Sequence, residues 1–176
     1  AGGATLSFTI EGLPVATSTE GVTTSIETTP TTVPFGSLPI GTPVTAAQRL
    51  TVSANAANGY TVFAYQRHTL LSETGDSIDP VTGTNASPAG WSSGCSTPAA
   101  GCYGYHSGED VLAGGSTRFA ANDSYARFDS APEEVAYAAG PVTARSTDVV
   151  YQVKVTDQQA AGSYNSSVVY IVVPVF

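Results

Sequence analysis

The chain of 176 residues has few cations and no methionine. Lys154 is the only lysine, and the six lysine and arginine residues face 14 carboxylates, so the formal net charge is −8. Binding to nucleic-acid phosphates requires clustered cations, and so does attraction to an anionic membrane surface. The composition therefore argues against a nucleic-acid partner and against an anionic membrane as partner.

Long apolar runs and amphipathic helices are also missing. The longest apolar run, Val168 to Phe176, has nine residues, and a membrane-spanning helix needs about 20. We therefore expect no membrane insertion. The given residues show no signal-peptide pattern, and we expect the start at Ala1-Gly2-Gly3 to be a mature end left by a processing protease. The nearest helix candidate, residues 131–136, is about one turn long.

The residues that are abundant favour strands. Serine, threonine and valine dominate, and 18 glycines and 11 prolines lie mainly between the apolar runs. This composition predicts an all-β fold, specifically an antiparallel two-sheet β-sandwich of the immunoglobulin or jelly-roll kind. We expect a hairpin of strands 48–54 and 60–66 turned by Asn58-Gly59. Strand 149–155 is expected to have one wet face, and strand 168–173, apolar on both faces, to be central.

The domain organisation is simple. Residues 1–21 are expected to be an N-terminal strand with its connector, and residues 22–176 a single β-sandwich domain. Within that domain, the sequence loses its periodicity between about 71 and 115. Such a stretch predicts a long loop insertion, and long loops are commonly functional.

The first strand carries the most informative pattern. Leu6, Phe8 and Ile10 alternate with small hydroxylated residues, which marks a half-buried strand. An extended apolar strand must find a groove, either in its own domain or in a neighbouring copy. In the second case it is a polymerisation donor strand, as in pilins. The acceptor groove is then expected at the last strand, with the apolar side chains Val168, Tyr170, Val172 and Phe176.

Two cysteines, Cys95 and Cys102, lie seven residues apart around Pro and Gly. The spacing predicts a local disulfide, which requires an oxidising compartment. The alternative is a zinc site that the two cysteines would form with His106. Three acidic residues of one loop offer a second metal alternative, a calcium site, although their spacing favours a solvated acidic loop: Glu73, Asp76 and Asp79. We expect no metal and no cofactor.

Catalytic motifs are weak. Residues 90–94 have the letters of a Gly-x-Ser-x-Gly nucleophile elbow, but that motif needs a strand before the serine and a helix after it, and the sequence predicts neither. His68 is expected at the solvated rim of a strand and His106 in packing among aromatic residues. We therefore expect no enzyme. Three Asn-x-Ser sequons are candidate glycosylation sites: Asn85, Asn122 and Asn165.

Two segments, 44–62 and 159–174, resemble exported β-sandwich proteins of bacterial cell surfaces. The closing Ala-Gly-x-Tyr turn before the final strand is similar to the end of WxL-type wall-binding domains and of spore-coat-U-like pilin domains. The first strand is similar in kind to that of donor-strand subunits, including TasA/camelysin-like fibres and chaperone-usher pilins. The Trp-x-Leu signature itself is missing, since Ser92-Ser93 follow Trp91. The resemblance implies assembly rather than wall attachment.

The sequence thus predicts a secreted, extracellular structural subunit whose partners are identical subunits. It would polymerise into a filament by inserting residues 4–10 into its neighbour. The alternative is a monomeric adhesion or glycan-binding module, in which the same strand completes its own sheet and the 91–106 loop binds the ligand. A secreted hydrolase ranks third.

Overall fold

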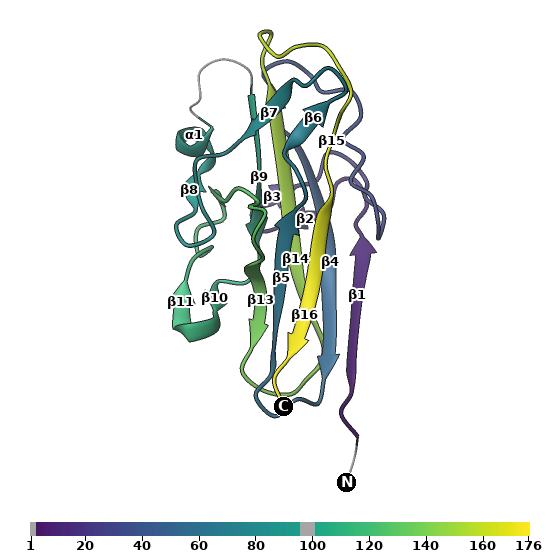
Figure 1. Cartoon of the computed structure of the whole chain (residues 1–176), viewed down its shortest axis with the longest axis vertical. Coiled ribbons are helices and arrows are strands. Elements are labelled where there is room, and N and C mark those ends of the chain that lie inside the picture. Colours follow the sequence, from purple (N-terminus) through teal and green to yellow (C-terminus); the bar gives the residue numbers. More distant parts are fainter. Residues whose placement is uncertain (1–2, 96–100) are drawn as a thin grey trace.

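The computed structural model describes residues 3–95 and 101–176, and it is almost entirely β (Figure 1). The largest sheet has seven strands and curls along its length. In order across the sheet, these strands are β1 (Leu6–Gly12), β4 (Val44–Ala54), β14 (Val142–Val155), β9 (Gly101–Ser107), β7 (Ser77–Pro80), β6 (Leu70–Ser72) and β15 (Tyr164–Asn165). All the pairs are antiparallel except β7 and β9, which pair in parallel over two residues.

A second sheet has three strands, and it packs against the first. Its order is β13 (Glu133–Ala138), β5 (Tyr60–Gln66) and β16 (Val168–Pro174). One core cluster joins the two sheets, because it combines Leu50 and Tyr151 of the large sheet with Val62 and Val135 of the small one. β-Branched and aromatic side chains fill this space, as the composition predicts.

Short elements make up the rest of the described chain. Three two-stranded pairs and two single-turn helices flank the sheets: β2 (Ser18–Thr19) with β3 (Val22–Thr23), β8 (Ala89–Gly90) with β12 (Ser124–Tyr125), β10 (Val111–Leu112) with β11 (Ser116–Thr117), α1 (Trp91–Gly94) and the 3₁₀ turn Ala113–Gly115. No helix in the described part of the chain is long and apolar enough to cross a membrane.

The hairpin expected around Asn58-Gly59 is wrong in its pairing. Strands β4 and β5 lie where the alternation predicts them, but β4 belongs to the large sheet and β5 to the small one. The turn is therefore a corner between sheets. Gly59 has φ +77°, and a Cβ at this position would lie 1.7 Å from the carbonyl oxygen of Ala138. Only glycine fits such a position, because both the dihedral and the close approach exclude a side chain.

Two further expectations differ from the structure on the outer face of the large sheet. The alternate residues of β14 are buried rather than wet, with Val150 fully inside, because the 13–28 segment and the chain around Trp91 cover that face. The stretch from 71 to 115 is not one loop. It contains β9, an entirely buried strand of the large sheet. Glycines and hydroxyl residues in β9 hide its strand pattern from sequence reading.

Candidate functional site

Strand β1 lies at an edge of the large sheet, and within residues 3–95 and 101–176 it pairs with β4 alone (Figure 1). The antiparallel register matches each residue of Leu6–Gly12 with one of Gln48–Ala54. Phe8 and Ile10 are half-buried and pack against the core cluster shared by the two sheets. Leu6 does not reach it and is 39% exposed. Two of the three predicted donor side chains therefore enter the core, and they enter the core of their own chain.

Asn55 fastens the start of β1. Its amide oxygen accepts a hydrogen bond from the backbone nitrogen of Thr5 at 2.8 Å, and its amide nitrogen donates to the carbonyl oxygen of Gly3 at 2.8 Å. The Asn55 backbone nitrogen also donates to the Thr5 carbonyl oxygen. A side-chain amide can replace a backbone peptide in this way. Asn55 thus extends the hydrogen-bond ladder between β1 and β4 past the end of β4. No sequence pattern predicts this role of Asn55.

The chain after β1 is anchored to the domain. Leu13 is buried, its nitrogen donates to Thr28 Oγ1 at 2.8 Å, and the Thr28 nitrogen donates to the Leu13 carbonyl oxygen at 3.0 Å. Gly12, the last residue of β1, directly precedes this anchor, and a Cβ at this position would lie 2.1 Å from the Thr28 carbonyl oxygen. The boundary between an edge strand and a fixed connector therefore falls at Gly12.

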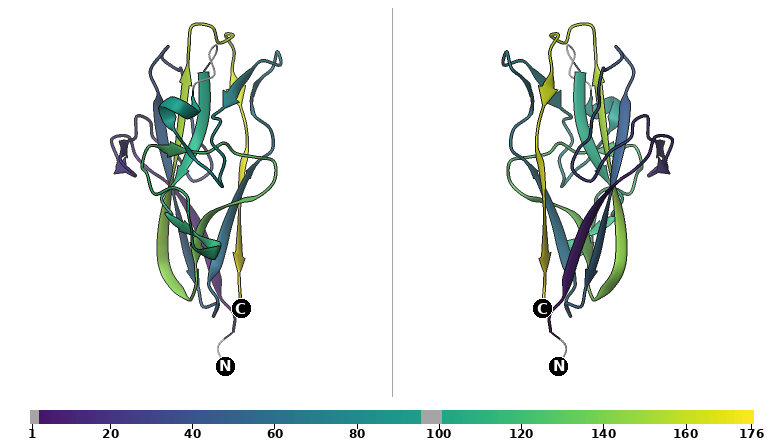
Figure 2. Two further views of the ribbon diagram at one scale, coloured as in Figure 1. Left: turned by 90° about the vertical axis from the view of Figure 1, so that its left-hand side faces the viewer. Right: turned by 90° about the vertical axis from the view of Figure 1, so that its right-hand side faces the viewer.

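Strand β16 lies on the same core as β1, whose position against β4 and this core is here called the β1 seat. Val168, Tyr170 and Val172 pack against the same core cluster as Phe8 and Ile10. Both strands lie on the side of the molecule that faces the viewer in the right-hand panel of Figure 2. Phe176, in contrast, is 61% exposed. Three of the four predicted acceptor residues thus line the core beside β1, and Phe176 lies outside it.

The hydroxyl groups of Tyr151 and Tyr170 hydrogen-bond to each other between the two sheets, and Tyr151 also donates to Gln48 Oε1 at 2.9 Å. Burial raises the pKa of both tyrosines above the ordinary value. Both groups therefore stay neutral at physiological pH. This uncharged pair ties β16 to β14 next to the seat of β1.

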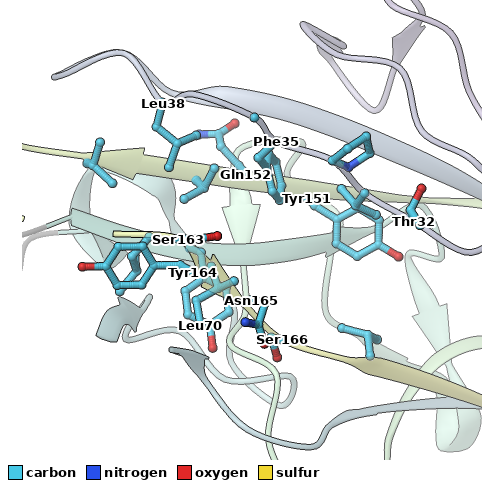
Figure 3. A pocket seen from close by; sticks show the side chains of 18 of the residues that line it. Thr32, Phe35, Leu38, Leu70, Tyr151, Gln152, Ser163, Tyr164, Asn165 and Ser166 are labelled. Carbon is cyan, nitrogen blue, oxygen red and sulfur yellow. The ribbon is translucent and has the colours of Figure 1, made fainter. Parts of the chain in front are cut away.

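An open groove of about 1320 Å³ continues from the end of β1 along the same side of the molecule. Figure 3 shows Phe35 and Leu38 of the irregular 30–40 segment on one wall and Leu70 and Tyr164 on the other. The segment contains prolines at positions 30, 34 and 39, which cannot donate to a ladder. Within the described residues this segment forms no strand beyond the single-residue bridge of Ile40 to Val155, so it contributes side chains to the groove wall.

The remaining predicted site residues are distributed over the molecule. Cys95 and Cys102 form a disulfide with Cα atoms 5.6 Å apart, so neither is available to zinc. Of the three sequons, Asn122 and Asn165 are exposed, whereas Asn85 is buried. Its amide nitrogen donates to Tyr105 Oη and to the Glu134 carbonyl oxygen. The Asn85 sequon is therefore inaccessible in the folded protein.

The segment around residues 91–106, the alternative ligand-binding surface, has its aromatic side chains in the protein interior. Trp91 is 8% exposed and contacts Tyr125 edge to face, and His106 is fully buried, with Nδ1 2.7 Å from the Ser124 carbonyl oxygen. Residues 96–100 lie outside the described residues. Rings that are buried in this way are not available to stack on a ligand.

The described residues do not provide the geometry that a metal site or a Ser92 nucleophile would need. No group of three His, Cys, Asp or Glu residues in residues 3–95 and 101–176 could hold a metal ion. Contrary to expectation, Ser92 does have a strand before it, β8, and a helical turn around it, α1. No described hydrogen bond joins Ser92 to His68, which is exposed and lies 2.8 Å through Nδ1 from the Thr69 carbonyl oxygen.

No protein-family model, no curated protein and no solved structure matches this chain. The functional argument therefore rests on its own residues and geometry.

Proposed function

We propose that this protein is a secreted β-sandwich subunit that assembles with identical copies into an extracellular filament by exchanging β1. The observation that carries the proposal is the placement of β1. It is an edge strand, it contributes Phe8 and Ile10 to the main core, and a single ladder with β4 holds it. The composition and the Cys95–Cys102 disulfide support an exported protein.

Exchange needs no new surface. If β1 opens at Gly12 while Leu13 stays anchored at Thr28, the β1 seat becomes vacant and accepts β1 of another copy. Every contact made within one chain is then made between two. Each copy gives one strand and receives one, so the interface is head-to-tail, and a head-to-tail interface that does not close into a ring extends as a filament.

The energetic terms favour a filled seat. Phe8 and Ile10 are half-buried, so together they contribute about 1.5–3 kcal/mol, which is half of the value for two fully buried side chains. An empty seat loses this contribution and leaves the β4 edge unpaired. A copy that has released its own β1 therefore binds another one strongly, and the Asn55 amide is available to hold it.

A register-specific disulfide tests the exchange. Thr9 lies opposite Thr51 in the ladder, and opposed Cα atoms are ~4.5–5.5 Å apart, inside the disulfide range. The variant Thr9→Cys/Thr51→Cys, oxidised after assembly, should give a ladder of covalent multimers on a denaturing gel without reductant. Thr9→Cys/Ser53→Cys is the matched control, because Ser53 lies opposite Ser7 and not Thr9.

The same gel would also show the outcome that contradicts strand exchange. If the Thr9–Thr51 bond forms quantitatively while the protein stays a covalent monomer, β1 belongs to its own chain and the exchange is refuted. Locking the bond in freshly diluted subunits before assembly should block filament growth, and reductant should restore it. Growth of the locked subunits at the normal rate would also contradict the proposal.

A further inference from the structure

Strand β16 is an edge strand on the same side of the molecule as β1. It differs from the other edge strands of the two main sheets in how its edge is protected. It pairs with β5 along its whole length, and its other side has no ladder partner within the described residues. An edge strand presents free N–H and C=O groups to any strand that approaches, and natural edges are usually protected by charge, bulges or shortness.

The other three edges carry such protection. β13 contains Glu133 and Glu134 and has a register shift after Glu134. β15 has only two residues, and β1 carries Glu11. β16, in contrast, reads Val-Val-Tyr-Ile-Val-Val-Pro and has no charge. This edge is the one that remains open to strand pairing.

The outward face of β16 is apolar as well. Ile171 and Val173 are 40% and 42% exposed, although both lie on a strand that also packs on the core. In the ladder, Ile171 lies beside Phe63, and Val169 lies beside Tyr65. A contiguous apolar stripe on a sheet face commonly marks an interaction surface.

We propose that β16 pairs edge to edge with β16 of a second copy, antiparallel and centred on Ile171, so that the two three-stranded sheets join into one of six strands. The sequence is nearly symmetric about this residue. In this register Ile171 faces its own counterpart, and Val169 faces Val173 of the other copy. Pro174 falls at the end of the ladder opposite Val168, where it removes one donor only.

The near-symmetry of the β16 sequence about Ile171 favours a second copy of the same strand as its partner. An antiparallel pair of identical strands has a two-fold axis, and a two-fold contact must be complementary to itself. The strand meets this condition with valine opposite valine, a β-branched pair that favours antiparallel ladders, and with no charge brought against a like charge. The β16 contact uses the free backbone edge and the outward side chains of this strand, whereas β1 pairs with β4 and its inward side chains share a core with the inward side chains of β16. The β16 contact joins copies, or filaments, side by side.

A single cysteine tests this register. Ile171→Cys should form a disulfide dimer under mild oxidation, since the two residues 171 face each other at the axis. Val173→Cys alone should not, because its counterpart lies four rungs away. A mixture of Val169→Cys and Val173→Cys should cross-link again. Equal dimer yields from Ile171→Cys and Val173→Cys would indicate random collisions and overturn the proposal, as would the absence of any Ile171→Cys dimer.

A charge at the axis provides a second measurement. Ile171→Lys places two ammonium groups opposite each other, and it should weaken self-association in sedimentation by about tenfold, while Thr61→Lys on the central strand β5 should change it little. In filaments, Ile171→Lys should leave the length unchanged and abolish side-by-side association. Loss of length with retained pairing would instead implicate β1, so the two proposals fail separately. Unchanged pairing in Ile171→Lys refutes the β16 contact.

Discussion

Phe8 and Thr9 are neighbours in the chain with opposite surroundings. Phe8 packs on the core cluster, and Thr9 on the other face of β1 is exposed. An aspartate at position 8 puts a charge against apolar side chains, which costs several kcal/mol. An aspartate at position 9 stays in water and should cost less than ~0.5 kcal/mol.

The measurement is the urea unfolding midpoint and the filament yield of Phe8→Asp and Thr9→Asp. We expect Phe8→Asp to lower stability by about 3 kcal/mol, close to the cost of truncating a buried phenylalanine, and to abolish filaments. Thr9→Asp should behave nearly as the parent. Equal tolerance of the two substitutions would show that the inner face of β1 is not buried in any state.

For single residues, the sequence predicts which face of a strand a side chain occupies, but it does not predict the tertiary contacts of that side chain. The alternation of β1 correctly assigns Phe8 and Ile10 to the inner face, but it cannot show that the main core ends before Leu6. A sequon at Asn85 says nothing of burial, because its amide is held by groups that come from positions 105, 118 and 134. Hydrogen-bond partners that are distant in the chain cannot be predicted from the local sequence.

The corner between β4 and β5 gives a prediction at the scale of elements. Gly59→Ala must adopt a left-handed dihedral and displace the Ala138 carbonyl oxygen. The dihedral alone costs ~1–2 kcal/mol, and overpacking adds ~1–3 kcal/mol. Gly36 is the matched control, since it has φ +65° with nothing within 4 Å of a built Cβ. It should show the dihedral cost only.

Thermal or urea unfolding of Gly59→Ala and Gly36→Ala separates the two terms. Gly59→Ala should lose at least twice as much stability as Gly36→Ala. Similar losses would mean that the two sheets are not held together at this corner as described.

The positions of strands could be predicted, and their partners could not. Alternation correctly places β1, β4, β5 and β14, and a short run that is apolar on both faces places β16, because both patterns are local properties. Pairing depends on which distant strand arrives, so the expected β4–β5 hairpin is wrong and the expected central strand β16 is an edge. The sequence does not reveal β9, because its glycines and hydroxyl residues hide a strand that is buried on both faces.

For the whole molecule, buried tyrosines set the response to alkali. Burial raises the pKa of Tyr125 to about 12, and it raises those of Tyr105, Tyr151 and Tyr170 above the ordinary value as well. Above about pH 10 the unfolded chain loses these protons while the folded chain keeps them. The unfolded state then binds fewer protons, so the free energy of unfolding falls as pH rises, by ~1.4 kcal/mol per pH unit for each such group.

Unfolding midpoints measured between pH 9 and pH 12 should therefore drop steeply, and phenolate absorbance should rise together with unfolding and not before it. Tyr125→Phe should be less stable than the parent at neutral pH, because the bond of Tyr125 Oη to Gln152 Oε1 is lost. Its stability should nevertheless fall less steeply with pH. A slope equal to that of the parent would show that Tyr125 does not contribute.

The three-stranded sheet also determines when the protein can fold. Its strands come from residues 60–66, 133–138 and 168–174, so no two of them are neighbours in the chain, and the central strand pairs with one that is made more than a hundred residues later. Contacts of such long sequence separation make folding slow, because large loops must close first. The three-stranded sheet therefore cannot be completed until β16 has been synthesised.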